Sequence, residues 1–146
     1  MSTAIDELRA AQALATKIRP KVGGFPYFAE ALRYAGVTRN EWTLPSCQSV
    51  YLTARGPIIT LGTPLASGML EVAPFDRSAL IHALREDQAG RSSFPEFLGA
   101  AWRAGVVRYV VDFEARNVSY FGANGEQYVE EYPAVELPGT EATMPA

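Results

Sequence analysis

Residues 25–51 read FPYFAEALRYAGVTRNEWTLPSCQSVY, and residues 94–120 read FPEFLGAAWRAGVVRYVVDFEARNVSY. Aligned without a gap at an offset of 69 residues, the two stretches are identical at nine of 27 positions. The identical pairs are Phe25/Phe94, Pro26/Pro95, Phe28/Phe97, Ala31/Ala100, Ala35/Ala104, Gly36/Gly105, Val37/Val106, Arg39/Arg108 and Tyr51/Tyr120. Internal repetition of this kind indicates that one structural unit occurs twice in the chain. We therefore expect an architecture of two similar halves.

The first copy of the repeat predicts two helices followed by three strands. Thr3 and Asp6 form a start that resembles a capping box. Pro26 suits the first turn of the second helix, and Gly36 suits its C-terminal cap. The expected elements are helices over about 3–18 and 25–35, then strands over about 37–44, 48–54 and 57–61.

The second copy predicts the same order. Asp76 can cap one helix, and Ser93 with Glu96 forms an S-x-x-E capping box for the next. Asn124-Gly125 is a strong signal for a tight hairpin between two strands. The expected elements are helices over about 77–89 and 94–104, then strands over about 106–113, 117–122 and 126–132.

The strand expected over 106–113 has alternating side chains, which point to opposite faces of a sheet. One face carries Val107, Tyr109, Val111 and Phe113, and the other carries Arg108 and Asp112. This pattern predicts a strand with one apolar face.

These elements predict an α+β protein. A unit of about 60 residues has only a marginal core, so the two repeats are expected to share one core in a single domain, 1–146. The repeats cover about 3–61 and 75–133, joined by a connector at 62–74 and followed by a flexible tail at 138–146. We expect two tandem helix-helix-strand-strand-strand repeats related by a pseudo-twofold axis, with the helices packed on one antiparallel sheet.

The composition is typical of a soluble globular domain, with 146 residues of which 48% are hydrophobic and 20% are charged. No apolar run approaches the roughly 20 residues that a membrane helix needs. The first residues, MSTAIDELRAAQ, carry acids and a periodic pattern where a signal peptide has a basic start and an apolar block. We therefore expect a cytoplasmic protein, and its single cysteine fits a reducing compartment.

The net charge of −3 is unevenly distributed. All 13 basic residues lie within 1–116, whereas residues 117–146 carry five acids and no base. A nucleic-acid-binding protein is expected to carry a dense basic stripe, and an acidic end repels phosphate. The sequence therefore predicts neither a nucleic acid nor a membrane as partner.

The residues of the second copy also resemble a known family. The order FP-x-F, then AGV-x-R-Y-x-V-D, then V-S-Y-F-G-x-N-G-E is similar to that of the YbcV-like family of small uncharacterised bacterial proteins, some of them labelled "phage envelope protein". The likeness is best over 75–133. It is thinner over 22–73, where Asn40 stands in place of Tyr109 and Arg55-Gly56-Pro57 replaces the glycine-rich hairpin. The resemblance implies a fold and supplies no activity or catalytic residue.

The sequence contains few residues from which catalytic or metal sites are commonly built. His82 is the only histidine and Cys47 the only cysteine, so one chain cannot complete a zinc site from nitrogen and sulfur ligands. We expect His82 to be a structural residue of its helix. Cys47 is expected to be an exposed, passive thiol beside a turn.

Three carboxylates, Asp112, Glu114 and Glu126, fall on one expected meander. They are either oxygen ligands for Mg²⁺ or Ca²⁺, which requires them to converge, or solvated residues at strand edges, which is the interpretation we favour. No catalytic residue, cofactor or metal site is therefore predicted, and the sequence favours a protein that is not an enzyme.

Two of the repeated pairs are polar: Arg39/Arg108 and Tyr51/Tyr120. In one interpretation they line a ligand-binding cleft between the repeats, where Arg binds an anionic group and Tyr stacks or donates a hydrogen bond. In the other, which we favour, each Arg lies across the sheet with its stem on apolar neighbours and pairs with a carboxylate such as Asp112 or Glu41.

Two functions follow as hypotheses. The leading one is a small, non-enzymatic interaction module that binds an unidentified protein partner or a second copy of itself, because the chain lacks a catalytic set and is rich in Tyr, Trp and Arg, which anchor interfaces. The alternative is a small-ligand-binding protein or weak enzyme with a cleft lined by Arg39, Arg108, Tyr51 and Tyr120.

Overall fold

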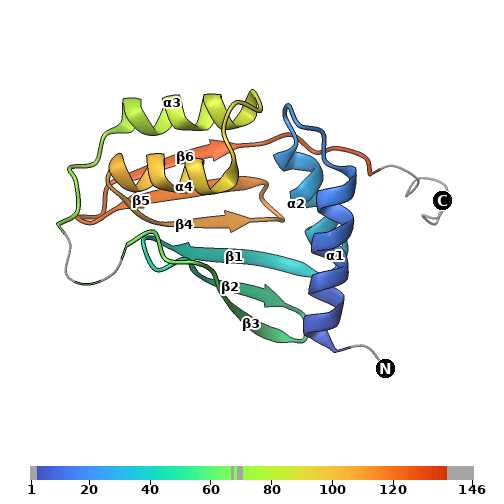
Figure 1. Ribbon diagram of the computed structural model, residues 1–146. Coiled ribbons are helices and arrows are strands. Elements are labelled where there is room, and N and C mark those ends of the chain that lie inside the picture. The colour runs from blue at the N-terminus through green and yellow to red at the C-terminus, as the bar shows by residue number, and fades with distance from the viewer. Residues whose placement is uncertain (1–2, 67, 69–70, 138–146) are drawn as a thin grey trace.

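The computed structural model describes residues 3–66, 68 and 71–137 (Figure 1). Its helices are α1 (Ala4–Ile18), α2 (Phe25–Tyr34), α3 (Arg77–Gln88) and α4 (Phe94–Arg103). Its strands are β1 (Val37–Thr43), β2 (Gln48–Thr53), β3 (Gly56–Leu61), β4 (Val106–Asp112), β5 (Asn117–Gly122) and β6 (Gln127–Glu131). The predicted α+β class is confirmed, as is the order of two helices and three strands in each repeat. The predicted tail at 138–146 lies outside the described residues.

The helices begin at their predicted capping residues. The hydroxyl of Thr3 accepts a hydrogen bond from the backbone N–H of Asp6 at 3.1 Å, and the hydroxyl of Ser93 accepts one from Glu96 at 3.2 Å. The carboxylate of Asp76 caps α3 in the same way. These bonds satisfy backbone donors that the first turn of a helix leaves unpaired. No described helix is long and apolar enough to span a membrane.

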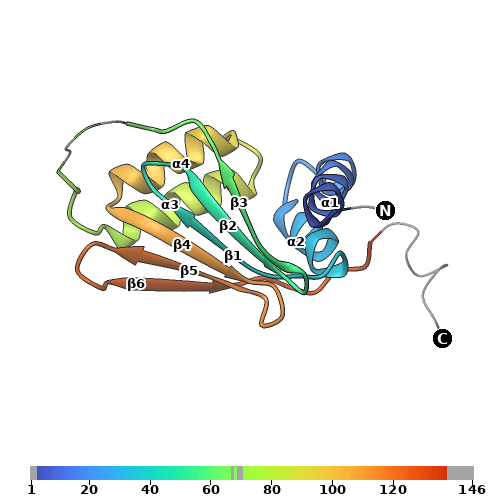
Figure 2. The ribbon, with the colours of Figure 1, turned by 90° about the horizontal axis from the view of Figure 1, so that it is seen from below.

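All six strands form one antiparallel sheet in the order β3-β2-β1-β4-β5-β6. The strands of each repeat make one half of the sheet, so β1 and β4 meet at its centre (Figure 1). Both helix pairs lie on the same side of the sheet (Figure 2). We call the side that faces the helices the inner face, which carries buried Tyr51, Tyr109 and Tyr120, and the opposite side the outer face.

The register at the centre of the sheet follows the sequence repeat. Glu41 and Val110, which are equivalent positions in the two repeats, are paired with each other in the β1–β4 ladder. Trp42 is paired with Tyr109 in this ladder. The positions equivalent to these two residues in the other repeat are Val111 and Asn40, and they are paired with each other as well. A twofold axis through the Glu41–Val110 pair would give this register; the pseudo-twofold axis itself stays a prediction.

Each repeat has a bulge at the same position of its first strand. The register shifts between Val37 and Arg39 in β1 and between Val106 and Arg108 in β4. Val107 was predicted to share one face with Tyr109, Val111 and Phe113, but it departs from this alternation: Val106 is fully buried and Val107 only partly so. The extra residue of a bulge reverses the alternation at that point of the strand, which a period of two cannot anticipate.

Aromatic contacts and the end of the chain tie the repeats together. Phe25 of α2 meets Tyr132, which follows β6, edge to face at 5.2 Å, and the equivalent Phe94 of α4 meets Trp42 of β1 in the same geometry at 5.2 Å. The chain beyond β6 runs back along the first repeat (Figure 1), where Leu137 packs with helix α1 and helix α2 residues and is 3% exposed. Each repeat therefore supplies a side chain to the helix layer of the other.

Replacing Leu137 with Ala should lower the free energy of unfolding by about 2–3 kcal/mol, because it leaves a cavity against α1 and α2. Urea denaturation followed by circular dichroism measures this difference. The matched control is Leu61→Ala on edge strand β3, where the side chain is 80% exposed and the expected change is below about 0.5 kcal/mol. Equal effects of the two substitutions would contradict the packing role of Leu137.

Candidate functional site

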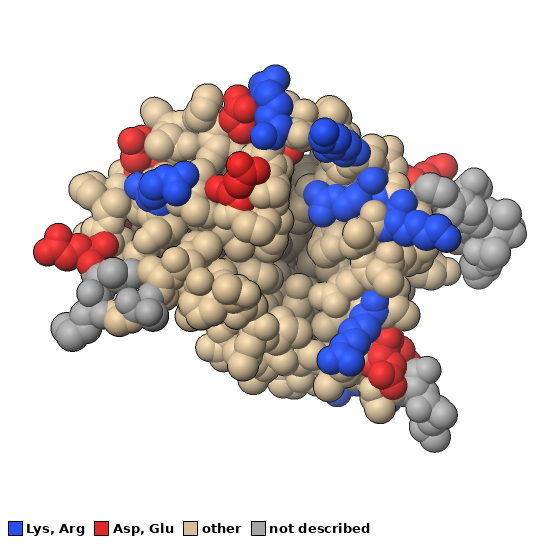
Figure 3. Space-filling model, viewed as in Figure 1, with Lys and Arg blue, Asp and Glu red and all other residues tan. Residues whose placement is uncertain are grey.

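The surface is hollowed between the α1–α2 half of the molecule and the α3–α4 half (Figure 3). The reason is architectural: each helix pair packs within its own repeat, and helices of different repeats make few direct contacts. The two pairs approach each other at their connecting loops, where the backbone N–H of Gly23 donates to the carbonyl of Gln88 at 2.8 Å. We call the recess over the inner face of β1 and β4 the inter-repeat hollow.

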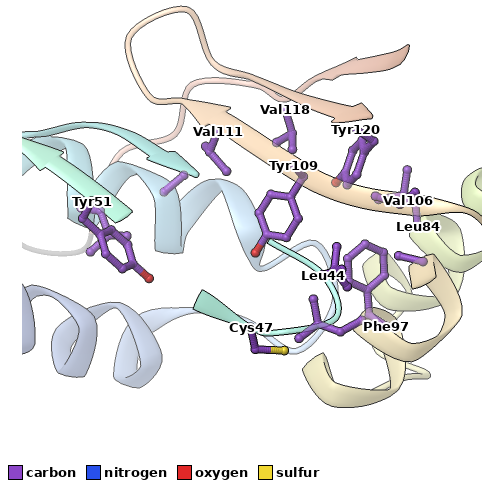
Figure 4. Packing of buried hydrophobic residues seen from close by; sticks show 14 of the residues in the cluster. Leu44, Cys47, Tyr51, Leu84, Phe97, Val106, Tyr109, Val111, Val118 and Tyr120 are labelled. Atoms are coloured by element: carbon purple, nitrogen blue, oxygen red, sulfur yellow. The ribbon is translucent and has the colours of Figure 1, made fainter. Parts of the chain in front are cut away.

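Three tyrosines lie on the inner face beneath the helices. Tyr109 is 8% exposed, and Tyr51 and Tyr120 are each 6% exposed. Figure 4 shows the rings of Tyr51 and Tyr109 projecting to the same side of the sheet, with Cys47 near the hydroxyl of Tyr109. Among the described residues, none forms a hydrogen bond with the hydroxyl of Tyr109 or of Tyr120. Both hydroxyls therefore lack a protein partner, although neither oxygen is among the fully buried side-chain atoms without one, so both are open to solvent.

Burial controls the protonation of these hydroxyls. It raises the pKa of Tyr109 well above its ordinary value, and the nearby Tyr120, Tyr51, Cys47 and Asp87 add to the rise. Burial also raises the pKa of Tyr51, and the Ser49 hydroxyl and the Gln12 amide offset part of that rise. The hydroxyl of Tyr109 therefore stays protonated at neutral pH, where it can donate a hydrogen bond and does not act as a base.

Aromatic rings extend the floor of the hollow to both sides of Tyr109. Trp42 lies parallel to Tyr109 with ring centres 6.1 Å apart, and Tyr120 lies at 5.8 Å on the other side. Phe97 of α4 meets Tyr120 edge to face. The Nε1 atom of Trp42 is buried and has no hydrogen-bond partner among the described residues. The inner face at the centre of the sheet is thus aromatic. Two of its hydrogen-bond donors, the Trp42 Nε1–H and the Tyr109 hydroxyl, have no partner among the described residues.

Two charged groups from different repeats face each other near the point where the helix pairs meet. Arg19 follows α1, and its guanidinium lies 5.3 Å from the centre of the Phe28 ring. Asp87 lies in the last turn of α3. Burial raises the pKa of Asp87, and the charge of Arg19 and the nearby Ser92 hydroxyl offset part of this rise. Lys and Arg side chains gather on the α1–α2 side of the hollow (Figure 3).

Cys47 differs from its prediction as an exposed thiol, because it is only 2% exposed. The segment after β3 folds back over the β1–β2 turn: the N–H of Gly62 donates to the carbonyl of Cys47 and the N–H of Leu65 to that of Pro45, each at 2.8 Å. Sequence alone does not reveal this covering segment.

The structure does not bring the four predicted site residues together. Tyr51 is paired with Asn40 and Tyr120 with Tyr109 on the inner face, whereas Arg39 and Arg108 occupy alternate positions and point to the outer face. Arg39 lies 3.9 Å from Asp112, and Arg108 lies 3.6 Å from Glu41.

The Arg108 guanidinium also lies 3.9 Å from the centre of the Phe121 ring. This arrangement matches the favoured interpretation, in which each arginine lies across the sheet with a carboxylate partner. Of the four predicted residues, the two tyrosines remain candidates for the hollow.

Sequence reasoning missed Tyr109, Trp42, Gln12, Arg19 and Asp87. Tyr109 had a usable signal, because alternation places it on the apolar face of β4 and the 69-residue repeat pairs it with Asn40. Arg19 and Asp87 had none, because they lie at the ends of helices in different repeats and only tertiary packing brings them near each other.

A second depression, of about 470 Å³, runs between α3 and α4. His82, Glu86, Arg91 and Arg103 line it over a floor that includes Ala83 and Ala100. Arg91 pairs with Glu86 at 2.9 Å, which neutralises part of this lining. Within the described ranges, no three His, Cys, Asp or Glu side chains are placed to hold a metal ion.

The raised pKa of Tyr109 predicts how stability depends on pH. Above about pH 10 the unfolded chain loses the Tyr109 proton while the folded protein keeps it, so this group makes the free energy of unfolding fall by up to about 1.4 kcal/mol per pH unit. Tyr109→Phe should therefore reduce the slope of stability against pH, measured by urea denaturation between about pH 9 and 11.5. Tyr34→Phe is the control, since Tyr34 is 57% exposed. A slope for Tyr109→Phe equal to that of the wild type would contradict the raised pKa of this hydroxyl.

The comparisons with known proteins extend across both repeats. Residues 12–131 match the model of a family described as "Protein of unknown function (DUF1398)". The chain is 54% identical over 143 residues to Uncharacterized protein Rv2012 of Mycobacterium tuberculosis (strain ATCC 25618 / H37Rv) and to Uncharacterized protein Mb2035 of Mycobacterium bovis (strain ATCC BAA-935 / AF2122/97), which covers 98% of this chain and 87% of each relative. These matches carry no phage label, and the YbcV-like resemblance stays a prediction. The chain belongs to the DUF1398 family.

Proposed function

We propose that this protein binds a small molecule in the inter-repeat hollow. The observation that supports the proposal is the unpartnered hydroxyl of Tyr109, on a side chain that is 8% exposed at the centre of the inner face. The hydroxyl oxygen is not among the fully buried side-chain atoms without a partner, so it opens to the hollow. A ligand atom there can accept the hydrogen bond that no described residue accepts from Tyr109.

The surroundings of Tyr109 suit binding better than catalysis. Ligand sites are mostly apolar and aromatic recesses with a few convergent polar groups, and Trp42, Tyr120 and Tyr51 supply such walls around Tyr109. A general base needs a pKa near the working pH, whereas burial moves the pKa of Tyr109 away from it. We therefore favour a binding protein over an enzyme.

The neutral fluorescent probe N-phenyl-1-naphthylamine should bind the wild-type protein with one site per chain and increased emission. Gln12→Trp should weaken binding at least tenfold, because this half-buried residue of α1 lies close to Tyr51 and a larger side chain would fill the hollow. The control is Leu14→Trp on the same helix, where the side chain is 47% exposed. Circular dichroism confirms that each variant is folded. Absence of binding, or equal binding by both variants, would refute the proposal.

A second candidate function is self-association through the outer face, on which no described helix packs. Several large apolar side chains of this face are exposed: Leu52 by 40%, Ile59 by 61% and Val129 by 44%. Arginines and carboxylates alternate at its centre, with Arg39 beside Asp112 and Arg108 beside Glu41. A face with both signs of charge arranged in this way can complement a second copy that is rotated by half a turn.

The size of the outer face permits such a dimer. Six strands about 4.8 Å apart, with about six residues each at about 3.3 Å, span roughly 550 Å² per copy. The two copies together then reach the roughly 1,000 Å² that a specific interface needs.

Size-exclusion chromatography with light scattering at about 100 μM should show a dimer of this chain that Ile59→Asp converts to a monomer, because a buried unpaired charge opposes association. Val22→Asp is the control, since Val22 is 64% exposed in the α1–α2 loop. A wild-type monomer at this concentration would exclude self-association as the function of this face.

A further inference from the structure

The inter-repeat hollow joins an aromatic floor to a cationic end. The floor consists of half-buried Trp42 and of Tyr109, with ring centres 6.1 Å apart, and Tyr120 continues the row under Phe97 at 5.8 Å from Tyr109. Rings in such a row favour a flat aromatic ligand, because stacked or edge-on contacts add to the burial of its surface. The chemistry of the floor thus suits the body of an aromatic molecule.

The cationic end belongs to the segment that links α1 and α2. Residues 8–29 contain four basic residues, Arg9, Lys17, Arg19 and Lys21, and no acid. The backbone carbonyl of Lys21 and its Cγ lie against Gly90, so close that a Cβ on Gly90 would come within 2.9 Å of that oxygen. The link therefore carries Arg19 and Lys21 to the place where the two repeats meet.

Arg19 is held in this place without a close ion pair. Its guanidinium rests on the ring of Phe28, and no salt bridge within 4.0 Å joins Arg19 or Lys21 to a described acid. Seven other arginines have such a partner among the described residues, as Arg116 has in Glu30 at 3.7 Å. A cation at the C-terminal end of α1 also interacts favourably with the helix dipole. That interaction does not explain why Arg19 lies beside the hollow.

Asp87 connects the cationic end to the floor. The hydrogen bond from Gly23 to Gln88, the residue after Asp87, brings the segment with Arg19 to the end of α3. The charge of Asp87 acts on Arg19 and on the hydroxyls of Tyr109 and Tyr120, so each of these three groups lies within electrostatic range of Asp87. Arg19 acts on Asp87, and Lys21 lies against Gly90, three residues further along the chain, so two cations and one carboxylate gather at this end of the hollow. An incoming anion would supply the missing countercharge.

We infer that the ligand of the inter-repeat hollow is an aromatic anion, such as an aromatic carboxylate, whose ring lies against Trp42 and Tyr109 and whose charged group pairs with Arg19. This inference rests on the proposed binding function and adds the chemical class of the ligand. The anion receives the charge-assisted hydrogen bonds that a guanidinium fork donates. The Tyr109 hydroxyl donates to a second acceptor atom on the ring or its substituent.

Three probes with the same ring system and different charges test the ligand class: 2-naphthoate, 2-naphthamide and 2-(aminomethyl)naphthalene. Isothermal titration calorimetry at low salt should give 2-naphthoate a dissociation constant at least tenfold lower than that of 2-naphthamide, and the amine should bind weakest. The preference for the anion should shrink as salt is raised, because salt screens partly exposed charges.

Arg19→Gln should reduce the preference for 2-naphthoate over 2-naphthamide to about one- to twofold, while leaving the affinity for the neutral probe unchanged. Arg19→Lys should retain most of the preference. The matched control is Arg9→Gln, an exposed residue of α1, the helix that Arg19 follows, which should preserve the wild-type ratio.

The outcomes separate the two proposals. Equal binding of the three probes, lost in Gln12→Trp, would overturn the anionic class and leave the binding function standing. A preference that survives Arg19→Gln would overturn the role of Arg19. No binding by any probe, together with no binding of N-phenyl-1-naphthylamine, would remove the binding function and this inference with it.

Discussion

The pairing of β1 with β4 is the interaction on which the rest of the structure depends. Among the described strands it is the only ladder that joins one repeat to the other. Helices of different repeats add few contacts, so the sheet sets the distance between the helix pairs. The register centred on Glu41 and Val110 places those pairs side by side over a shared inner face. The inter-repeat hollow is a direct result of that spacing.

The candidate site lies where the two repeats have diverged. Asn40 and Tyr109 are equivalent positions, and both face inward on the central strands. The Asn40 amide is satisfied, since it donates to the Ser49 hydroxyl at 2.6 Å and to the carbonyl of Val50 at 3.1 Å. The Tyr109 hydroxyl has no described partner. At this position the first repeat thus satisfies its inward-facing side chain with internal hydrogen bonds, whereas the second repeat leaves the Tyr109 hydroxyl without a described partner.

Local signals made the fold predictable from sequence. Caps such as Thr3 and Ser93 mark helix starts through short-range hydrogen bonds, and the repeat allows one half to check the other. Features that depend on tertiary structure were not predictable. The bulge before Arg108 reverses which valine is buried, and the burial of Cys47 requires a later segment to fold over it.

The residues of the candidate site likewise divide into those that the sequence could identify and those that only tertiary structure reveals. Tyr51 and Tyr120 could be chosen because they recur in both repeats, and the sheet places both on the inner face. Arg39 and Arg108 recur as well, but strand alternation sends them to the other side. Residues that recur in both repeats are those that the fold of each repeat requires. A ligand site instead requires groups that converge from different helices and strands. Arg19 and Asp87 are of this second kind.

The reciprocal aromatic contacts have a consequence for how the chain reaches its native state. Phe25 needs Tyr132 from the far end of the chain, and Phe94 needs Trp42 from the first repeat. Neither repeat can therefore complete its helix layer before the other is in place. Contacts of such long sequence separation slow folding and make it cooperative. A protein built from two similar halves should in this case fold and unfold as one unit, without an intermediate in which only one half is ordered.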